Sequence, residues 1–526
     1  MRISLPQVLD QAAERYPDKE AVRCNGKALT YAELQRRADA LACLLQQQGV
    51  RRGDRVGMFM NKDLESAVTV YGIMKAGGAY VPLDPFAPVS RLNFVIQDCG
   101  IKVLVTKPNK LPQVKEMVAE TNLTTVIGIE PQANLGVQCI TWDSVVNAPP
   151  TARPNIHVIE QDLAYILYTS GSTGTPKGIM HTHRSALSFA EWAADEYGLT
   201  SEDRVSNHAP FHFDLSTFDM YATAIAGGTT VIIPEFVTKF PASLSKLLQD
   251  ERITVSYSVP FALIQMMERG VLESRDLSAL RWVLFAGEVF PTKHLRRLMQ
   301  MLPHARFSNL YGPTETNVCT FYHVNEIPQT DEPIPIGIPC ANEEMLVVDA
   351  DDNPVPPGEV GELLVRGGTV MRGYWGRPDL NEKGFYRRQV FGFYEDVFYR
   401  TGDLVQLLPD GNYKYLGRKD RQVKTRGYRV ELDEVEVALL SHEGVQEAAV
   451  YTVPDGEGSN LIEAAVIPKE GVELTPAMLA RHANTKLPHY AVPVTIHVMR
   501  DFPRTSTGKI NRRELQALSM KNGASV

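Results

Sequence analysis

The residues best suited to chemistry lie in one stretch, residues 163–178, which reads LAYILYTSGSTGTPKG. An apolar run of strand length leads into a segment made almost wholly of Thr, Ser, Gly and Pro with one lysine. Glycines let the backbone approach an anion, hydroxyls donate hydrogen bonds, and a lysine adds a mobile positive charge. The composition therefore predicts a phosphate-binding loop, with donors at Thr169, Ser170, Gly171, Ser172, Thr173 and Lys177.

Two other interpretations of this loop are a flexible Gly/Ser linker and a Walker A motif. A linker would be more hydrophilic on both sides and would not carry a Pro-Lys pair. The Walker A spacing G-x-x-x-x-G-K-[ST] fails because Pro176 precedes Lys177. Beyond the loop, apolar residues from Ala186 to Tyr197 keep helical spacing, so the loop is expected to join a strand to a helix.

Helices and strands are expected to alternate through most of the chain. Thr30 and Glu33 form a capping-box pattern before a helix that Gly49 ends, and a strand is expected over residues 56–60. Further strands are expected over residues 229–233, 253–259, 282–286 and 306–311. This alternation is typical of an α/β fold with parallel strands. Residues 333–415 change to short runs broken by Gly and Pro turns, which predicts a β-rich subdomain.

The length of 526 residues is too great for a single core. A charged segment, residues 417–422, precedes a stretch with the size of a small α+β domain. Strands are expected there over residues 448–453 and 461–467, and a helix over residues 476–486. We place the boundary at Asp420, which predicts a large N-terminal domain of residues 1–419 and a small C-terminal domain of residues 420–526.

Composition excludes several classes of protein. A net charge of −8 argues against a nucleic-acid partner. The N-terminus lacks the apolar region of a signal peptide, and no apolar run is long enough to span a membrane, so a cytoplasmic protein is expected. The six cysteines show no C-x-x-C spacing, which favours reduced thiols over disulfides or structural zinc.

The loop and the motifs around it resemble those of adenylate-forming enzymes: acyl-CoA synthetases, luciferases and the adenylation domains of nonribosomal peptide synthesis. The other motifs are LTYAEL at 29–34, KAGGAYVPLD at 75–84, FDLS at 213–216, NLYGPTE at 309–315, YRTGDL at 399–404 and TGK at 507–509. The resemblance covers almost the whole chain. It implies a large N-terminal domain of parallel α/β sheets with a β-rich subdomain, and a small, mobile α+β C-terminal domain.

The resemblance also implies the reaction. A carboxylate is a poor electrophile, so the family joins it to the α-phosphate of ATP, with Mg²⁺, and a thiol then attacks the mixed anhydride. Lys509 would stabilise charge on the phosphoryl transition state, Glu315 would hold Mg²⁺, and Asp420 would be the hinge of the small domain. Beside the loop, the expected ATP-binding residues are Gly287, Glu288, Asn309, Tyr311, Gly312, Thr314, Asp403, Tyr415, Arg418 and Lys424.

Asp214 indicates the substrate class. A carboxylate in an apolar neighbourhood needs a partner, and in the amino-acid-activating branch of the family that partner is the substrate's α-ammonium. The family's pocket-lining positions fall on Leu215, Phe218, Tyr257, Leu284, Ala286, Leu310, Val318 and Cys319. They include no charged residue, and their bulk leaves room for a small apolar substituent.

This lining resembles that of stand-alone L-proline-activating enzymes of secondary metabolism, so L-proline is the expected substrate. The segment around Asp214 is also similar to D-alanine-activating ligases, which leaves D-alanine or another small amino acid as the alternative. An acyl-CoA ligase is a further alternative, against which Asp214 argues. No segment after Lys509 resembles a carrier domain, so a separate phosphopantetheinylated carrier protein is the expected partner.

Overall fold

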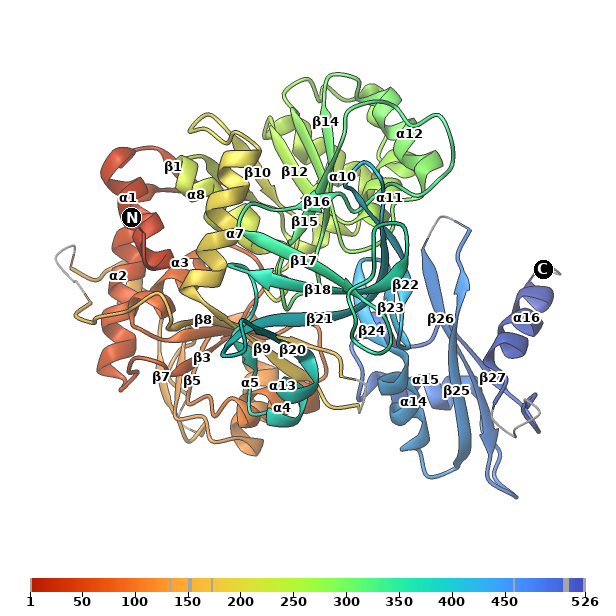
Figure 1. Ribbon diagram of the computed structural model, residues 1–526. Helices are drawn as coiled ribbons and strands as arrows, with labels where there is room; N and C mark the ends of the chain where they lie inside the picture. The colour runs from red at the N-terminus through yellow and green to blue at the C-terminus, as the bar shows by residue number, and fades with distance from the viewer. Residues whose placement is uncertain are drawn as a thin grey trace. The chain divides into compact units, whose positions relative to one another are not determined.

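The computed structural model describes residues 2–132, 134–149, 154–171, 174–456, 459–504 and 510–523 (Figure 1). The chain divides into two compact units. The first comprises Met1–Pro85, Val95–Tyr168 and Gly178–Lys419, and the second comprises Phe86–Phe94, Thr169–Lys177 and Asp420–Val526. All six cysteines are free thiols.

Two large sheets form the centre of the α/β region. The first has the order β16 (Ile338–Pro339), β15 (Thr320–Val324), β14 (Arg306–Tyr311), β13 (Trp282–Phe285), β12 (Val255–Ser258), β10 (Arg204–Asn207), β11 (Thr229–Ile232), β1 (Glu20–Cys24) and β2 (Lys27–Thr30). Its strands β10 to β14 pair in parallel. The second has the order β19 (Gly373–Tyr374), β9 (Lys177–Thr182), β8 (Leu163–Thr169), β4 (Ala79–Pro82), β3 (Arg55–Phe59), β5 (Val103–Thr106), β6 (Thr125–Ile127) and β7 (Gln138–Ile140).

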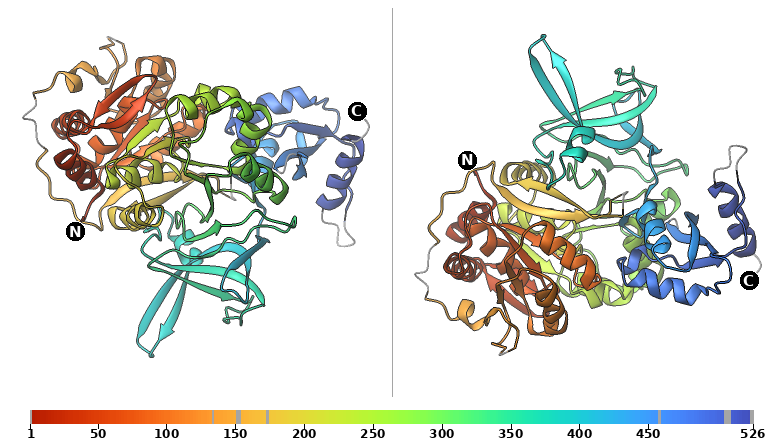
Figure 2. Two further views of the ribbon diagram at one scale, coloured as in Figure 1. Left: turned by 90° about the horizontal axis from the view of Figure 1, so that it is seen from above. Right: turned by 90° about the horizontal axis from the view of Figure 1, so that it is seen from below.

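A third sheet is antiparallel and lies as a layer beside the other two, in turquoise in Figure 2. It contains β17 (Glu343–Val348), β18 (Val360–Gly367), β21 (Tyr394–Leu407), β20 (Phe385–Val390) and β22 (Tyr413–Arg418). The helices of the first unit include α1 (Leu5–Arg15), α2 (Tyr31–Gln47), α3 (Leu64–Lys75), α5 (Leu111–Glu120), α6 (Asp143–Val146), α7 (His183–Glu196), α8 (Thr223–Ala226), α9 (Glu235–Thr238), α10 (Pro241–Asp250), α11 (Pro260–Arg269), α12 (Thr292–Met301) and α13 (Pro378–Gly384).

The part of the chain after Asp420 is short and contains both helices and strands. A two-stranded sheet joins β23 (Gln422–Thr425) to β24 (Tyr428–Glu431), and a three-stranded sheet contains β25 (Val445–Pro454), β26 (Asn460–Pro468) and β27 (Thr495–Val498). The helices are α14 (Leu432–Leu440), α15 (Pro476–Asn484) and α16 (Arg512–Gly523), and α4 (Val89–Asp98) contributes its first residues to the same unit. The expected fold class, α/β sheets with a β-rich part and a small α+β part, is confirmed.

Local sequence signals explain many of the element boundaries. The capping box is confirmed, because the Thr30 side chain accepts a hydrogen bond from the backbone of Glu33 and the Glu33 side chain accepts one from Thr30. The strand expected over residues 306–311 is β14, and the strands expected near residues 229, 253 and 282 are β11, β12 and β13. Each of these short strands packs apolar side chains within a layered core.

One expectation about the glycine-rich loop is wrong. The loop does not lead from β8 into a helix, because β9 follows it and α7 begins only at His183. Thr182 caps α7 by accepting a hydrogen bond from the backbone of Ser185. The strand was hidden because its first residues, Lys177 and Gly178, share the polar and glycine-rich composition of the loop, and β9 is only six residues long.

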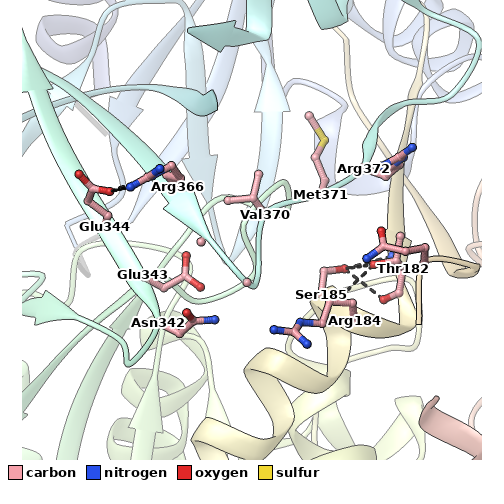
Figure 3. A pocket seen from close by; sticks show the side chains of 13 residues that line it. Thr182, Arg184, Ser185, Asn342, Glu343, Glu344, Arg366, Val370, Met371 and Arg372 are labelled. Atoms are coloured by element: carbon pink, nitrogen blue, oxygen red, sulfur yellow. Dashed lines mark hydrogen bonds and ion pairs between the residues drawn. The ribbon is translucent and has the colours of Figure 1, made fainter. Parts of the chain in front are cut away.

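A cavity of about 610 Å³ lies in the first unit between the start of α7 and the strands β17 and β18 (Figure 3). Thr182 and Ser185 lie on one side of it, and Glu343 and Arg366 lie on the other. Burial raises the pKa of Glu343 to about 8. None of the residues predicted to bind ATP or substrate lines this cavity, so it is separate from the predicted active site.

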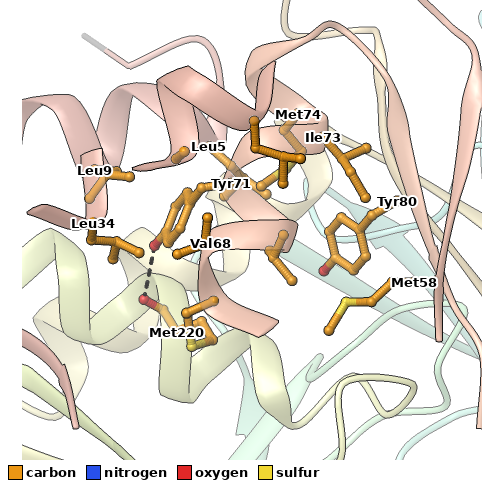
Figure 4. Packing of buried hydrophobic residues seen from close by; sticks show 14 of the residues in the cluster. Leu5, Leu9, Leu34, Met58, Val68, Tyr71, Ile73, Met74, Tyr80 and Met220 are labelled. Carbon is orange, nitrogen blue, oxygen red and sulfur yellow. Dashed lines mark hydrogen bonds between the residues drawn. The ribbon is translucent and has the colours of Figure 1, made fainter. Parts of the chain in front are cut away.

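The core around α1, α2 and α3 reaches the segment that is predicted to bind the substrate (Figure 4). Leu9, Leu34 and Tyr71 are almost wholly buried there. The Tyr71 hydroxyl donates a 3.3 Å hydrogen bond to the carbonyl of Met220, in the π-helical turn η2 (Phe218–Ala222). A buried tyrosine requires a partner for its hydroxyl, so this contact fixes η2 against the helical core.

Candidate active site

A hydrogen-bonded group of side chains forms at the end of β14. Tyr311 is the last residue of β14, and its hydroxyl donates a hydrogen bond to Asp403 Oδ2 in β21. Arg418, at the end of β22, donates to Asp403 Oδ1 at 2.7 Å. Burial raises the pKa of Tyr311 well above its usual range, and the negative charge of Asp403 adds to this, so the phenol remains a neutral donor.

Other predicted ATP-binding residues lie near this group. The Tyr415 ring lies 6.2 Å from the Tyr311 ring between centroids, tilted by 45°. Asn309 lies in β14 and donates to the carbonyl of Pro335 at 2.9 Å. Position 312 needs glycine, because a Cβ there would lie 1.6 Å from the carbonyl oxygen of Asn317. The structure thus brings Asn309, Tyr311, Asp403, Tyr415 and Arg418 together.

Two further predicted residues follow β13. Gly287 has a φ of +96°, a left-handed conformation that favours glycine. Glu288 turns its side chain back to the start of α11, where Oε1 accepts a 2.8 Å hydrogen bond from the backbone of Phe261. A carboxylate at a helix N-terminus is stabilised by the helix dipole. This contact fixes the turn after β13.

Glu315 is completely buried and is held by a tyrosine that the sequence motifs did not reveal. The Tyr374 hydroxyl donates to Glu315 Oε1 at 2.8 Å, and it lies 3.1 Å from the hydroxyl of Tyr399. Tyr374 is 59 residues from Glu315, and only the pairing of β19 with β9 brings it there. Within the described part of the chain, no three acidic, His or Cys side chains gather as a metal cage. A Mg²⁺ ion held by Glu315 would take further oxygen ligands from water and phosphate groups, as Mg²⁺ commonly does.

His181 is a second functional candidate that the motifs missed. Its Nε2 donates to the carbonyl of Thr314 at 2.8 Å, and its Nδ1 lies 3.1 Å from Ser185 Oγ. Burial lowers the pKa of His181 to about 4, so the imidazole is neutral. Its ring also stacks on Tyr165 with centroids 5.1 Å apart. His181 therefore fixes the backbone next to Glu315.

Asp214 lies in a series of turns before η2 and is 9% exposed. Thr217 donates to the carbonyl of Asp214 through its Oγ1 at 2.6 Å, and Asn317 donates to the same Oγ1 at 2.9 Å. Burial raises the pKa of Tyr257 well above its usual range, and the negative charge of Asp214 adds to the shift. A carboxylate so enclosed has a strong electrostatic preference for a cationic group.

The residues predicted to line the substrate pocket largely share one apolar cluster. This cluster contains Phe218, Tyr257, Leu284, Ala286, Leu310 and Val318, with Leu215 packed against it. Tyr257 and Leu284 are paired neighbours on β12 and β13, and the Phe218 ring meets Tyr257 edge-on with centroids 5.4 Å apart. Cys319 packs instead in the adjoining cluster that contains Tyr311.

The remaining residues that were predicted to bind ATP or act in catalysis belong to the second unit or lie outside the described residues. Thr169, Ser170, Gly171 and Lys177 fall in the second unit, as do Asp420 and Lys424. Lys424 lies on β23 opposite Arg429 of β24. Ser172, Thr173 and Lys509 lie outside the described residues.

The described residues contain no helix that is both long and apolar enough to cross a membrane.

Residues 9–375 match the family described as AMP-binding enzyme, and residues 434–509 match the AMP-binding enzyme C-terminal domain. The chain is 37% identical over 499 residues to an L-proline--[L-prolyl-carrier protein] ligase of Pseudomonas fluorescens, covering 95% of this chain and 96% of that one. A ligase of the same name from Streptomyces coelicolor is 38% identical, covering 93% and 91%.

A solved structure of the amide bond synthetase McbA from Marinactinospora thermotolerans matches the fold, with a TM-score of 0.88 and 23% identity over 98% of this chain and 99% of that one. The family match spans most of the chain, and the resemblance inferred from the motifs is confirmed. The chain therefore belongs to the AMP-binding enzymes and is an adenylate-forming ligase that uses ATP.

Proposed function

We propose that this ligase joins L-proline to AMP, releases pyrophosphate, and then transfers the prolyl group to the phosphopantetheine thiol of a separate carrier protein. Amino-acid activation and carrier loading are supported by the names of the two relatives, which cover almost the whole chain. The choice of proline rests on those names together with the side chains around Asp214.

Asp214 is the observation that carries the proposal. This residue is 9% exposed and lies just before η2, whose first residue, Phe218, belongs to the apolar cluster. An ammonium would offset the cost of burying this charge, and the apolar neighbours favour a small, uncharged substituent. An α-amino acid such as proline offers both features. A fatty acid offers no ammonium.

Asp403 and Glu315 take roles that fit their contacts, and the roles of Lys509 and the glycine-rich loop follow from the family. Asp403, fixed by Tyr311 and Arg418, would accept hydrogen bonds from the ribose hydroxyls. Glu315, oriented by Tyr374, offers an oxygen ligand to Mg²⁺, which would neutralise phosphate charge when bound. Lys509 would stabilise the charge that develops on the transferred phosphoryl group. The glycine-rich loop would contact the phosphates.

ATP–pyrophosphate exchange with every proteinogenic amino acid, D-alanine and a set of fatty acids tests the proposal. The highest exchange is expected with L-proline. If D-alanine, an aromatic amino acid or a charged amino acid gave the highest exchange, the assignment of proline would be wrong. Exchange driven only by fatty acids would contradict amino-acid activation altogether.

The second half of the proposal needs a carrier. Radiolabelled proline should become bound to a phosphopantetheinylated carrier protein in the presence of ATP, and the same carrier without its phosphopantetheine arm is the control. Release of the label from the carrier by neutral hydroxylamine, which cleaves a thioester to a hydroxamate and the free carrier thiol, would identify the bond as a thioester. Formation of prolyl-AMP without transfer to any carrier thiol would contradict the second step.

A further inference from the structure

A buried lysine outside all the motifs named above lies behind the segment that carries Asp214. Lys62 follows β3 and is 5% exposed. Its Nζ donates to three successive backbone carbonyls, those of Asn207 at 2.9 Å, His208 at 2.7 Å and Ala209 at 3.4 Å. An ammonium has three N–H donors, so these carbonyls match its full capacity. They lie where the chain leaves β10 toward Asp214.

A second contact closes the same segment at its far end. Asn207 Nδ2 donates to the carbonyl of Ala209 at 3.1 Å and to Asp219 Oδ2 at 2.9 Å. Asp219 is completely buried in η2, directly after Phe218. Residues 207 and 219 are thus tied together, and Asp214 lies on the loop between them. We call Lys62, Asn207 and Asp219 the clamp of this loop.

Two backbone turns connect the clamp to Asp214. The backbone of Phe213 donates to the carbonyl of Pro210 at 3.0 Å, and the backbone of Thr217 donates to the carbonyl of Asp214 at 2.9 Å. The first turn restricts the backbone between Ala209 and Asp214, and the second turn begins at Asp214 itself. A displacement of the three clamped carbonyls would therefore move the Asp214 carboxylate.

The charges around Lys62 show that its burial has a cost. Burial lowers the pKa of Lys62 to about 8, while the carboxylates of Glu235 and Asp219 and the Cys24 thiol oppose that shift. The backbone of Lys62 also donates to Glu235 Oε1 at 2.8 Å. Burial raises the pKa of Asp219 well above its usual range, and Lys62 and Asn207 oppose this. A buried ammonium is costly, and a packed apolar side chain is often the more stable alternative.

From these contacts we infer that Lys62 is a positioning residue for the amino-acid substrate: it fixes the start of the 208–214 segment so that Asp214 receives the substrate ammonium. Lys62 acts through the backbone of this segment. The inference rests on the proposed function, because it takes Asp214 as the partner of that ammonium. Lys62 would thus affect binding of the amino acid, while other side chains bind ATP.

The test compares Lys62→Met with wild type in ATP–pyrophosphate exchange, using the amino acid that gives the highest wild-type activity. Lys62→Met removes the three donors while keeping a long, unbranched side chain. The KM for the amino acid is expected to rise about tenfold or more, while kcat and the KM for ATP stay within about threefold of wild type. This split is expected because a displaced Asp214 binds the substrate ammonium less well in the ground state, while the ATP contacts remain.

Lys75→Met is the matched control. Lys75 is also buried in the first unit, but its Nζ binds Asp39 at 2.6 Å and Asp10, far in sequence from residues 207–219. The Lys75→Met variant is expected to have a lower Tm than wild type and an unchanged KM for the amino acid. Equal rises in that KM for both lysine variants, or no rise for Lys62→Met, would overturn the inference.

Asn207→Ala is a second variant, which removes the bridge between Ala209 and Asp219 and leaves the ammonium in place. It is expected to raise the KM for the amino acid selectively as well. If Lys62→Met does not fold, Asn207→Ala decides, and if neither folds the clamp is structural and the inference is overturned. A best substrate other than proline would contradict the proposed function alone, because the same comparison can be made with that substrate.

Discussion

Arg418 and Asp403 lie opposite each other in register on β22 and β21, and Arg418 donates a 2.7 Å hydrogen bond to Asp403 Oδ1. The other carboxylate oxygen accepts from Tyr311, and Asp403 is 3% exposed. The carboxylate is therefore held in one orientation before any nucleotide binds. Each oxygen retains acceptor capacity beyond these contacts, which suits a pair of ribose hydroxyls.

Asp403→Asn is expected to raise the KM for ATP about tenfold or more, because an amide keeps only one acceptor oxygen and loses the charge that Arg418 faces. The KM for the amino acid should change little. Pyrophosphate exchange at varied ATP measures the effect. Asp410→Asn is the control, because Asp410 is exposed and only caps a turn by accepting from Asn412 at 3.1 Å. Equal effects of the two substitutions would contradict the ribose role.

Asp214→Ala is expected to lower kcat/KM for the amino acid by about a hundredfold or more, because the substrate ammonium would lose its counter-charge in a site of low dielectric. The fold should persist, since the substitution keeps the backbone turn in which Thr217 donates to the carbonyl of residue 214. Exchange activity and the Tm are the measurements. Asp195→Ala, on the exposed face of α7, is the control. Turnover like that of wild type in Asp214→Ala would refute the assignment.

Stability should depend on pH through His181. Its pKa falls from the ordinary 6.5 to about 4 in the folded chain, so stability is unaffected by this group above about pH 6.5. Between about pH 6.5 and 4 only the unfolded chain binds the proton, and the free energy of unfolding should fall by about 1.4 kcal/mol per pH unit for this group. Below about pH 4 both states are protonated and the loss ends.

Urea unfolding followed by tryptophan fluorescence measures this effect, because all four tryptophans lie in the first unit with His181. His181→Gln should reduce the slope of stability against pH in the stated window, whatever it does to stability at neutral pH. His157→Gln is the control at an exposed position. An unchanged slope in His181→Gln would contradict the prediction, because it would show that His181 binds a proton equally well in the folded and the unfolded chain.

The sequence was most informative where local chemistry decides the structure. The Thr30 capping box and the strand over residues 306–311 follow from patterns of a few neighbouring residues. The role expected of Asp403 rests instead on the resemblance of YRTGDL to a motif of the family. Tyr257, Leu284 and Leu310 also share one cluster, because they lie on the adjacent parallel strands β12, β13 and β14. Strand alternation predicted these strands without the structure.

Side chains that meet across long separations could not be predicted in this way. Tyr374 reaches Glu315 only because β19 pairs with β9, and Lys62 reaches Asn207 across 145 residues. Neither residue belongs to a pattern of fixed spacing. The strand β9 was missed for a different reason, since its first residues have the composition of the loop before it. Contacts of this kind depend on sheet order, which local patterns do not encode.

Lys509→Ala is expected to abolish adenylate formation while largely sparing thioester formation from prolyl-AMP supplied in the assay. One lysine on the small domain can serve only one half-reaction if that domain must rotate to admit the carrier thiol. Pyrophosphate exchange and transfer from prolyl-AMP to the carrier are measured separately. Lys521→Ala, another lysine near the end of the chain, is the control. Equal losses in both half-reactions for Lys509→Ala would count against this division.

The last prediction concerns Asp420 as the hinge of the small domain. Asp420 is the residue at which the second unit resumes after Lys419; it is exposed, and its Oδ1 accepts a 3.1 Å hydrogen bond from the backbone of Gln422. A residue in such a charged loop can absorb the change in φ and ψ that a domain rotation requires. Proline would fix φ near about −65° and remove that freedom.

Asp420→Pro should therefore slow prolyl transfer to the carrier by about tenfold or more while changing ATP–pyrophosphate exchange far less. Asp420→Ala is the matched control, because it removes the carboxylate and its hydrogen bond to Gln422 but leaves φ free. If both variants slow transfer equally, the carboxylate matters and backbone rotation at this residue does not. Equal losses of exchange and transfer in Asp420→Pro, or no loss of transfer, would place the pivot at another residue. A selective loss of transfer in the proline variant alone is the result that a hinge at Asp420 requires, since only that variant restricts the backbone.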